Sequence, residues 1–208
     1  RTTNNSEWRS RGYITADAVS DAGWRDFSSS SRLRRMYLDL GARGEQTEFH
    51  LSFTGADNKL GSVAATPVEM LNQRWSSVYT WPQNTRNQLA FLQASANYNP
   101  SDTVLLQANA YYRGFRQSHV DGNTTDAQPC AAPGLLCFGD NTTPLLNFAG
   151  TQVPDVFGSN LGQIDRTSTS ANTFGGALQA TSTAKVLNHD NHFVIGASID
   201  RGFARFAG

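Results

Sequence analysis

The amino-acid sequence predicts an all-β fold, an antiparallel up-and-down meander of about seven long strands. Charged residues make up only 16% of the 208 residues, below the roughly 25% of an ordinary soluble domain. Ser, Thr, Asn and Gln fill the difference at roughly 31%, and aromatic residues contribute 11%. This composition favours strands over helices, and apolar residues alternate with polar ones in seven segments.

Each segment places apolar side chains at every second position, which is the side-chain period of a strand. The sixth segment is the weakest because it includes a glycine-rich stretch. The segments, each with its apolar positions, are 12–20 (Ile14, Ala16, Ala18), 34–42 (Met36, Leu38, Leu40, Ala42), 48–54 (Phe49, Leu51, Phe53), 88–98 (Leu92, Ala94, Ala96, Tyr98), 103–115 (Leu106, Ala108, Ala110, Tyr112), 173–183 (Phe174, Leu178, Ala180) and 192–201 (Phe193, Ile195, Ala197, Ile199).

Strand length and the composition of the second face favour a transmembrane β-barrel as the setting of this meander. Most segments run for about nine to eleven residues, the length that a tilted strand needs to cross a bilayer and longer than a typical strand of a globular sheet. Their second face carries Gln, Asn, Ser, Tyr, Arg and Asp, as the lumen of a membrane barrel does. A half-buried sheet in a soluble protein would show the same alternation, so that alternative stays open.

The connections between the segments alternate strictly between short and long. Short turns are expected at 42–46, 99–102 and 187–191, and long loops at 55–87 and 117–170. Outer-membrane barrels show this alternation because one rim carries short periplasmic turns and the other carries long external loops. The parity therefore predicts that both long loops are external.

Six stretches of the sequence, spread over residues 10 to 206, resemble the barrel of TonB-dependent outer-membrane receptors. Their order and spacing carry the resemblance, since no single stretch is diagnostic. They are Gly23-Trp-Arg-Asp-Phe27, Met36-Tyr-Leu-Asp-Leu-Gly41, Leu51-Ser-Phe-Thr-Gly-Ala-Asp-Asn58, Thr85-Arg-Asn-Gln-Leu89, Leu105-Leu-Gln-Ala-Asn-Ala-Tyr-Tyr-Arg113 and Ala197-Ser-Ile-Asp-Arg-Gly202.

The resemblance implies a place in the bacterial outer membrane and a role in importing a scarce nutrient, commonly a ferric siderophore, haem or cobalamin in this family. We expect a ferric siderophore or a similar iron chelate. Such receptors close a 22-stranded barrel with an N-terminal plug, and the TonB complex energises them through a short box ahead of the plug. We expect residues 1–208 to be a middle section of such a barrel domain, because seven strands do not close a barrel and no plug or TonB box is recognised. The alternative is a soluble or surface-attached all-β binding or adhesion module.

The only two cysteines, Cys130 and Cys137, lie inside the longer expected loop and are separated by Ala-Ala-Pro-Gly-Leu-Leu. Two thiols in a polar external loop favour a disulfide in an oxidising compartment. A metal site would need further ligands, and the nearest histidine is His119. We therefore expect a disulfide that orders the loop.

Aromatic and arginine side chains form the second group of candidates, and the resemblance suggests that they contact a bulky anionic ligand. Three belong to the first long loop and three to the end of the fifth segment. An aromatic girdle at the membrane interface is the alternative role for such residues. The candidate ligand-facing residues are Trp75, Tyr79, Trp81, Tyr111, Arg113 and Arg116.

The charge pattern argues against several other classes. The chain carries 17 Lys+Arg and 17 Asp+Glu, so its formal net charge is zero, and nucleic-acid binding is disfavoured. The basic run Arg32-Leu-Arg-Arg35 at the expected external rim would attract lipopolysaccharide phosphates or another anion, or it would be an ordinary polar rim.

Gly-x-Ser-x-Gly, Walker, dinucleotide-binding and His-Glu-x-x-His motifs are absent. We expect no enzymatic activity, no cofactor and no bound metal. We expect outer-membrane lipid as a partner.

Overall fold

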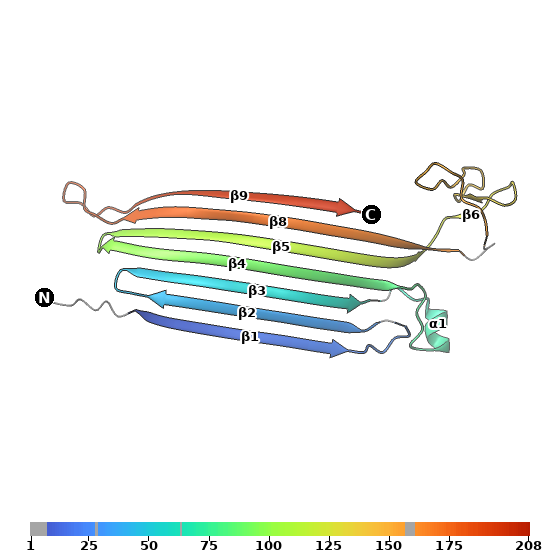
Figure 1. Cartoon of the computed structure of the whole chain (residues 1–208), viewed down its shortest axis with the longest axis horizontal. Coiled ribbons are helices and arrows are strands. Elements are labelled where there is room, and N and C mark those ends of the chain that lie inside the picture. The colour runs from blue at the N-terminus through green and yellow to red at the C-terminus, as the bar shows by residue number, and fades with distance from the viewer. Residues whose placement is uncertain (1–7, 28, 63, 157–160) are drawn as a thin grey trace.

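A computed structural model describes residues 8–27, 29–62, 64–156 and 161–208 of the chain. These residues form one antiparallel seven-stranded sheet in which each strand pairs with the next one in the order β1-β2-β3-β4-β5-β8-β9 (Figure 1). The strands are β1 (Arg9–Asp21), β2 (Ser31–Arg43), β3 (Thr47–Gly61), β4 (Gln83–Ser101), β5 (Val104–Thr124), β8 (Gly162–Ser182) and β9 (Phe193–Ala207).

The predicted all-β meander is confirmed, and all seven segments are neighbours in it in chain order. The sheet is open, with β1 at one edge and β9 at the other (Figure 1). Most strands are longer than the apolar alternation indicated. The clearest cases are β5, which continues to Thr124, and β8, which begins at Gly162. Their polar extensions pair with each other throughout, because the backbone hydrogen bonds of a ladder do not require apolar side chains.

The strand register brings the predicted apolar positions onto one face of the sheet. A central row across the sheet contains Gly12, Leu40, Leu51, Ala94, Ala110, Gly176 and Ile199. Two further rows on each side of this central row, one pair toward each end of the strands, complete a band that we name the apolar belt. In β4 the belt runs from Ala90 to Tyr98. At the ordinary strand rise this is about 27 Å. Among the described residues of these five rows, Arg201 is the only charged one.

No second layer covers either face of the sheet among the described residues. Belt side chains are exposed, including Ile199 at 73% and Leu178 at 68%. The only buried apolar residues in the described part of the chain are Leu136 and Cys137, and both lie in a connection. A globular domain normally buries its apolar face between two layers, so this sheet has a large apolar surface that no other described part of the chain covers.

Successive connections lie alternately at the two ends of the sheet. Residues 44–46, 102–103 and 183–192 connect strands at the end near the N-terminus, and 22–30, 62–82 and 125–161 connect them at the other end (Figure 1). The second group contains α1 (Val68–Gln73) and a small hairpin of β6 (Gln128–Pro129) and β7 (Leu136–Cys137). Short turns at two of the three predicted places, residues 44–46 and 102–103, are confirmed, whereas the predicted turn at 187–191 is the longer connection 183–192. The two long loops are shorter than predicted because the strands extend into them.

No described helix of this chain is both long enough and apolar enough to cross a membrane.

Candidate ligand-binding site

The second face of the sheet carries polar side chains and contains a hollow of about 800 Å³. Strands β3, β4, β5 and β8 line it, at the half of the sheet nearer the long connections. Apolar and aromatic walls come from Leu89, Phe91 and Phe115, and polar groups come from Arg113 and Tyr111. Largely apolar walls with a few polar groups are typical of small-molecule sites.

The Tyr111 side chain is fixed in this hollow from two sides. Its ring lies 6.0 Å from the ring of Phe91, measured between centroids, and its hydroxyl donates a hydrogen bond to Asp200 Oδ1 at 2.5 Å. Gly175 lies between the two residues in the ladder. A Cβ atom there would come within 2.2 Å of Asp200 Oδ1 and 2.8 Å of the Tyr111 ring. Glycine at this position therefore permits the bond across β8.

Arg113 supplies the positive charge of the hollow. Its neighbours across the strands are Phe91 and Thr173, neither of which carries charge. In the described residues no carboxylate lies within ion-pair distance of Arg113. A guanidinium without a protein anion in an aromatic hollow is suited to a ligand with carboxylate, phenolate or phosphate oxygens.

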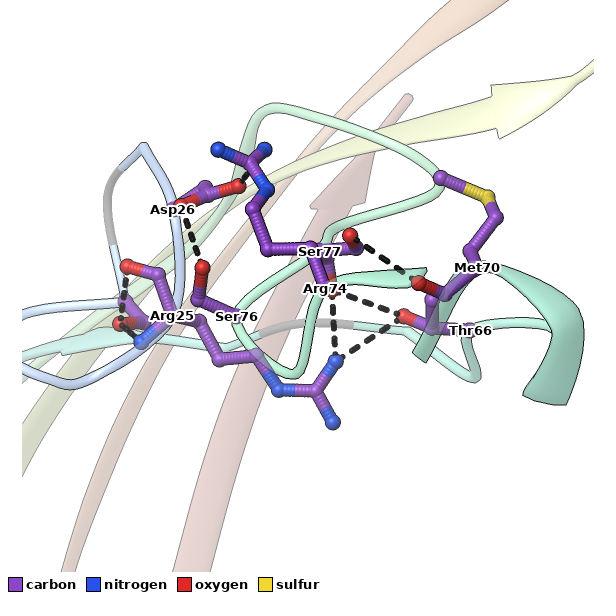
Figure 2. Close-up of polar contacts among 8 residues, drawn as sticks. Arg25, Asp26, Thr66, Met70, Arg74, Ser76 and Ser77 are labelled. Carbon is purple, nitrogen blue, oxygen red and sulfur yellow. Dashed lines mark hydrogen bonds and ion pairs between the residues drawn. The ribbon is translucent and has the colours of Figure 1, made fainter. Parts of the chain in front are cut away.

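Two of the connections at the end of the sheet away from the N-terminus, residues 22–30 and 62–82, are joined to each other (Figure 2). Arg25, between β1 and β2, donates hydrogen bonds to the Ser77 carbonyl oxygen at 2.7 Å and to Thr66 Oγ1 at 3.1 Å. Asp26 donates its backbone N–H to the Ser76 carbonyl oxygen at 2.9 Å and accepts a hydrogen bond from Ser76 Oγ at 2.8 Å. We name this set of contacts the loop junction.

An ion pair and an aromatic stack extend the loop junction. Asp26 also pairs with the Arg74 guanidinium. The Trp24 and Trp75 rings stack with centroids 5.5 Å apart, and the Arg25 guanidinium lies 4.5 Å from the centroid of Trp24. The contacts hold the connection between β3 and β4 to the one between β1 and β2, so these two loops form one structural unit.

The structure brings only some of the predicted ligand-facing residues together. Tyr111 and Arg113 line the same hollow. Trp75 packs on Trp24 in the loop junction, and Trp81 lies with its ring centroid 5.7 Å from that of Phe27.

The remaining two predicted residues are not part of either group. Tyr79 is exposed in the same connection as Trp75. Arg116 is paired with Gln88 on the opposite face of β5 from Arg113, because successive side chains of a strand alternate. The structure therefore separates Arg116 from the hollow.

The predicted disulfide joins Cys130 to Cys137, with 5.0 Å between their Cα atoms. It closes the β6–β7 hairpin, and Cys137 is only 1% exposed. A neighbouring turn is organised by Asp140, whose carboxylate accepts hydrogen bonds from the Thr143 hydroxyl at 2.5 Å and from the N–H groups of Thr143 and Thr142 at 2.8 and 2.9 Å. These bonds, chiefly those from Thr143, lower the pKa of Asp140 from 3.8 to about 2.

Several residues of the hollow and of the loop junction were not predicted from the sequence. Phe91 and Phe115 occupy positions where the alternation calls for polar side chains, and this break in the pattern was the available signal. Arg25 and Gly175 act through partners far away in the sequence, so local patterns gave no indication of them.

In the described segments, no group of three or more His, Cys, Asp or Glu side chains is placed to hold a metal ion. Comparison with known proteins yields no matching family model, no matching curated protein and no matching solved structure.

Proposed function

We propose that the chain is part of an outer-membrane, TonB-energised importer of a scarce nutrient, and that its ligand is a ferric siderophore or a similar anionic iron chelate. The observation that carries the proposal is the apolar belt. Its five rows of described side chains contain a single charged residue, Arg201. The Arg201 guanidinium lies 4.8 Å from the ring centroid of Phe203, in the belt row nearest the long connections. A lipid-facing band of about 25 Å is typical of a membrane β-barrel.

The arrangement of the strands supports the same proposal. Every strand of the sheet pairs with its neighbour in the chain, and the two longest connections, residues 62–82 and 125–161, lie at the same end of the sheet (Figure 1). A transmembrane β-barrel combines these features with an apolar exterior and a polar lumen. In this interpretation the polar face of the sheet lines the lumen and the long connections are external.

The hollow on the polar face supports an anionic chelate as the ligand. Arg113 offers a charged donor, and Phe91 and Tyr111 offer aromatic surface beside it. A ferric siderophore combines a negatively charged centre with bulky apolar or aromatic arms. The resemblance of the sequence to TonB-dependent receptors suggests the same ligand class.

The direct experiment asks whether the apolar belt faces lipid. Ala94→Cys places a thiol in the central row of the belt and Ser95→Cys places one on the polar face, at adjacent positions of β4. Each variant has one free thiol besides the Cys130–Cys137 disulfide, and is reconstituted in phospholipid vesicles and labelled on that thiol with an environment-sensitive dye. We expect brominated acyl chains to quench the dye at position 94, and aqueous iodide to quench the dye at position 95.

The same preparations distinguish the alternative function. A soluble or surface-attached binding module would be monodisperse in buffer without detergent, would unfold cooperatively, and would leave both dyes accessible to iodide. That result would overturn the membrane proposal. We expect instead that the wild-type chain aggregates in buffer, because two open edges and an apolar face are exposed.

A further inference from the structure

The hollow on the polar face changes its chemistry from row to row along the strands. Phe91 and Arg113 belong to one row of the register and supply an aromatic ring and a positive charge. The next row toward the long connections supplies only apolar side chains to the hollow, those of Ala56, Leu89 and Phe115. A ligand that lies lengthwise in the hollow therefore meets a charged region first and an apolar region beyond it.

The row beyond the apolar one supplies three side-chain amides, Asn58, Asn87 and Gln117, which we name the amide tier. No residue of this row carries a charge in the described strands. Gln117 Nε2 donates a hydrogen bond to Asn87 Oδ1 at 2.9 Å. Arg113 and Gln117 are four positions apart in β5, which is about 14 Å at the ordinary strand rise. The hollow is therefore elongated, with a charged inner part and a neutral, hydrogen-bonding outer part.

Asn58 has an acceptor that the described protein groups do not satisfy. Its Oδ1 atom is buried and accepts no hydrogen bond from any described residue. Its neighbours across the strands are Leu33, which has no polar side-chain group, and Asn87. A buried carbonyl oxygen without a donor costs folding free energy, and nearly all such groups in native proteins have a partner. In the wall of a binding hollow, this oxygen is suited to a ligand that brings an N–H or O–H group.

We propose that the amide tier, through Asn58 Oδ1, selects ligands whose outer end carries N–H or O–H donors. The proposal rests on the function proposed above and specifies the ligand further, as an anionic iron chelate with neutral peptide-like or hydroxylated arms. The chelate centre lies against Arg113, the apolar parts of the arms contact the row of Leu89 and Phe115, and the donors at the ends of the arms reach Asn58. A chelate whose arms end in anionic groups would meet no cation in this row of the described strands.

The test compares two ferric tricatecholates of equal charge that differ only at the ends of their arms. One ends each arm in an acetamide N–H, and the other in an N-methylated acetamide, which has no donor. Both are titrated into the whole chain in non-ionic detergent micelles, and tryptophan fluorescence reports binding. The test variant Asn58→Leu removes the acceptor. The matched control Asn109→Leu makes the same change on the polar face of β5, in a separate hollow.

We expect the wild-type chain to bind the chelate with N–H groups about fivefold more tightly than the N-methylated one, because one neutral hydrogen bond contributes on this scale. Asn58→Leu should weaken the first chelate to the level of the second, and Asn109→Leu should keep the preference. Asn58→Ala, which should act like Asn58→Leu, covers the case in which leucine does not fit. Absence of a preference in the wild type, or an equal preference in the wild type and the Asn58 variants, would overturn the proposal.

Stability separates ligand selection from a structural role of Asn58. Because Asn58 Oδ1 has no donor among the described residues, Asn58→Leu should leave the midpoint of urea unfolding unchanged or raise it. A lower midpoint together with a lost preference would mean that Asn58 supports the fold, and it would overturn the direct role of the carbonyl oxygen.

Failure here is distinguishable from failure of the proposed function. A wild-type chain that binds both chelates equally, with both affinities lowered by Arg113→Ala, overturns only the role of the amide tier. A wild-type chain that binds neither chelate overturns the proposed ligand class and, with it, this inference.

Discussion

The same seven strands build two faces that differ in nearly every property. One face has the apolar belt, with a single arginine in five rows. The other has ion pairs and polar networks, such as Arg35 with Asp17, and His50 with Glu48 and Arg11. Since side chains alternate along a strand, a one-residue slip of any strand would move its apolar side chains to the polar face and its polar side chains to the apolar face. The comparison teaches that the difference between the faces fixes the register of an open, single-layer sheet.

The strongest way to break this comparison is to place the same charge on adjacent positions of one strand. Leu51 is in the central row of the apolar belt and Ser52 is on the polar face of β3. We expect Leu51→Arg to lower the free energy of unfolding in vesicles by about 2–4 kcal/mol, because arginine at the middle of a bilayer is costly.

The control for this prediction is Ser52→Arg, which adds the same side chain to a face that already carries arginines. It should change the unfolding free energy by less than about 1 kcal/mol. Urea titrations followed by circular dichroism measure both. Equal destabilisation by the two substitutions would mean that the faces have similar surroundings, contrary to the proposed orientation.

The second prediction sharpens the comparison within β5, where Arg113 and Arg116 lie on opposite faces. Arg113→Ala should weaken binding of an anionic iron chelate by about 1–3 kcal/mol through loss of a charged hydrogen bond. Arg116→Ala removes the same charge from the other face and should leave chelate binding unchanged. Titration of the tryptophan fluorescence with a ferric chelate measures both affinities, and equal losses would place the ligand outside the hollow.

The meander and the face on which each apolar side chain lies were accessible from the sequence for the same reason that the two faces differ. Apolar residues at every second position, such as Leu92, Ala94 and Ala96, mark both a strand and the face it presents. The full length of the strands was not accessible, since residues 118–124 and 162–172 carry little apolar alternation and are strand because their backbones pair. Apolar alternation shows which part of a strand has one apolar face, whereas the backbone hydrogen bonds between strands continue past that part.

The candidate site was only partly predictable. Tyr111 and Arg113 were found because they are unusual residues on the polar face at the end of a recognised strand. The loop junction was not found, because Arg25 bonds to Thr66 and Ser77 in another connection. Contacts between loops depend on the positions of the strands that carry them, which a local pattern does not contain.

The third prediction concerns this junction and compares its two arginines. Arg25 is partly buried and bonds to two loop oxygens, whereas the Arg74 side chain is 66% exposed and pairs with Asp26. We expect Arg25→Ala to destabilise the two connections by about 1–2 kcal/mol, since acceptors within the junction lose their donor. Arg74→Ala should have a smaller effect, because exposed ion pairs contribute little.

Hydrogen exchange of the amide groups in residues 22–27 and 64–82 measures the third prediction. Faster exchange in both connections after Arg25→Ala would confirm that they form one unit. Faster exchange in the first connection alone would show that the second is ordered independently of Arg25.

The smallest expected effect concerns the turn at Asp140, which lies in a connection and not in the sheet. The pKa of Asp140 is about 2 in the folded turn, against 3.8 ordinarily, because Thr143 and Thr142 donate hydrogen bonds to the ionised carboxylate. A lowered pKa means that ionised Asp140 stabilises the turn above about pH 4 and that this contribution is lost as pH falls through 2. The amide shifts of Thr142 and Thr143 should therefore titrate with a midpoint near pH 2.

Asp140→Asn retains an acceptor oxygen but does not ionise, so the amide shifts of Thr142 and Thr143 in this variant should stay constant over this range. A midpoint near pH 4 in the wild-type chain would contradict the prediction, because it would mean that these hydrogen bonds do not favour the ionised carboxylate.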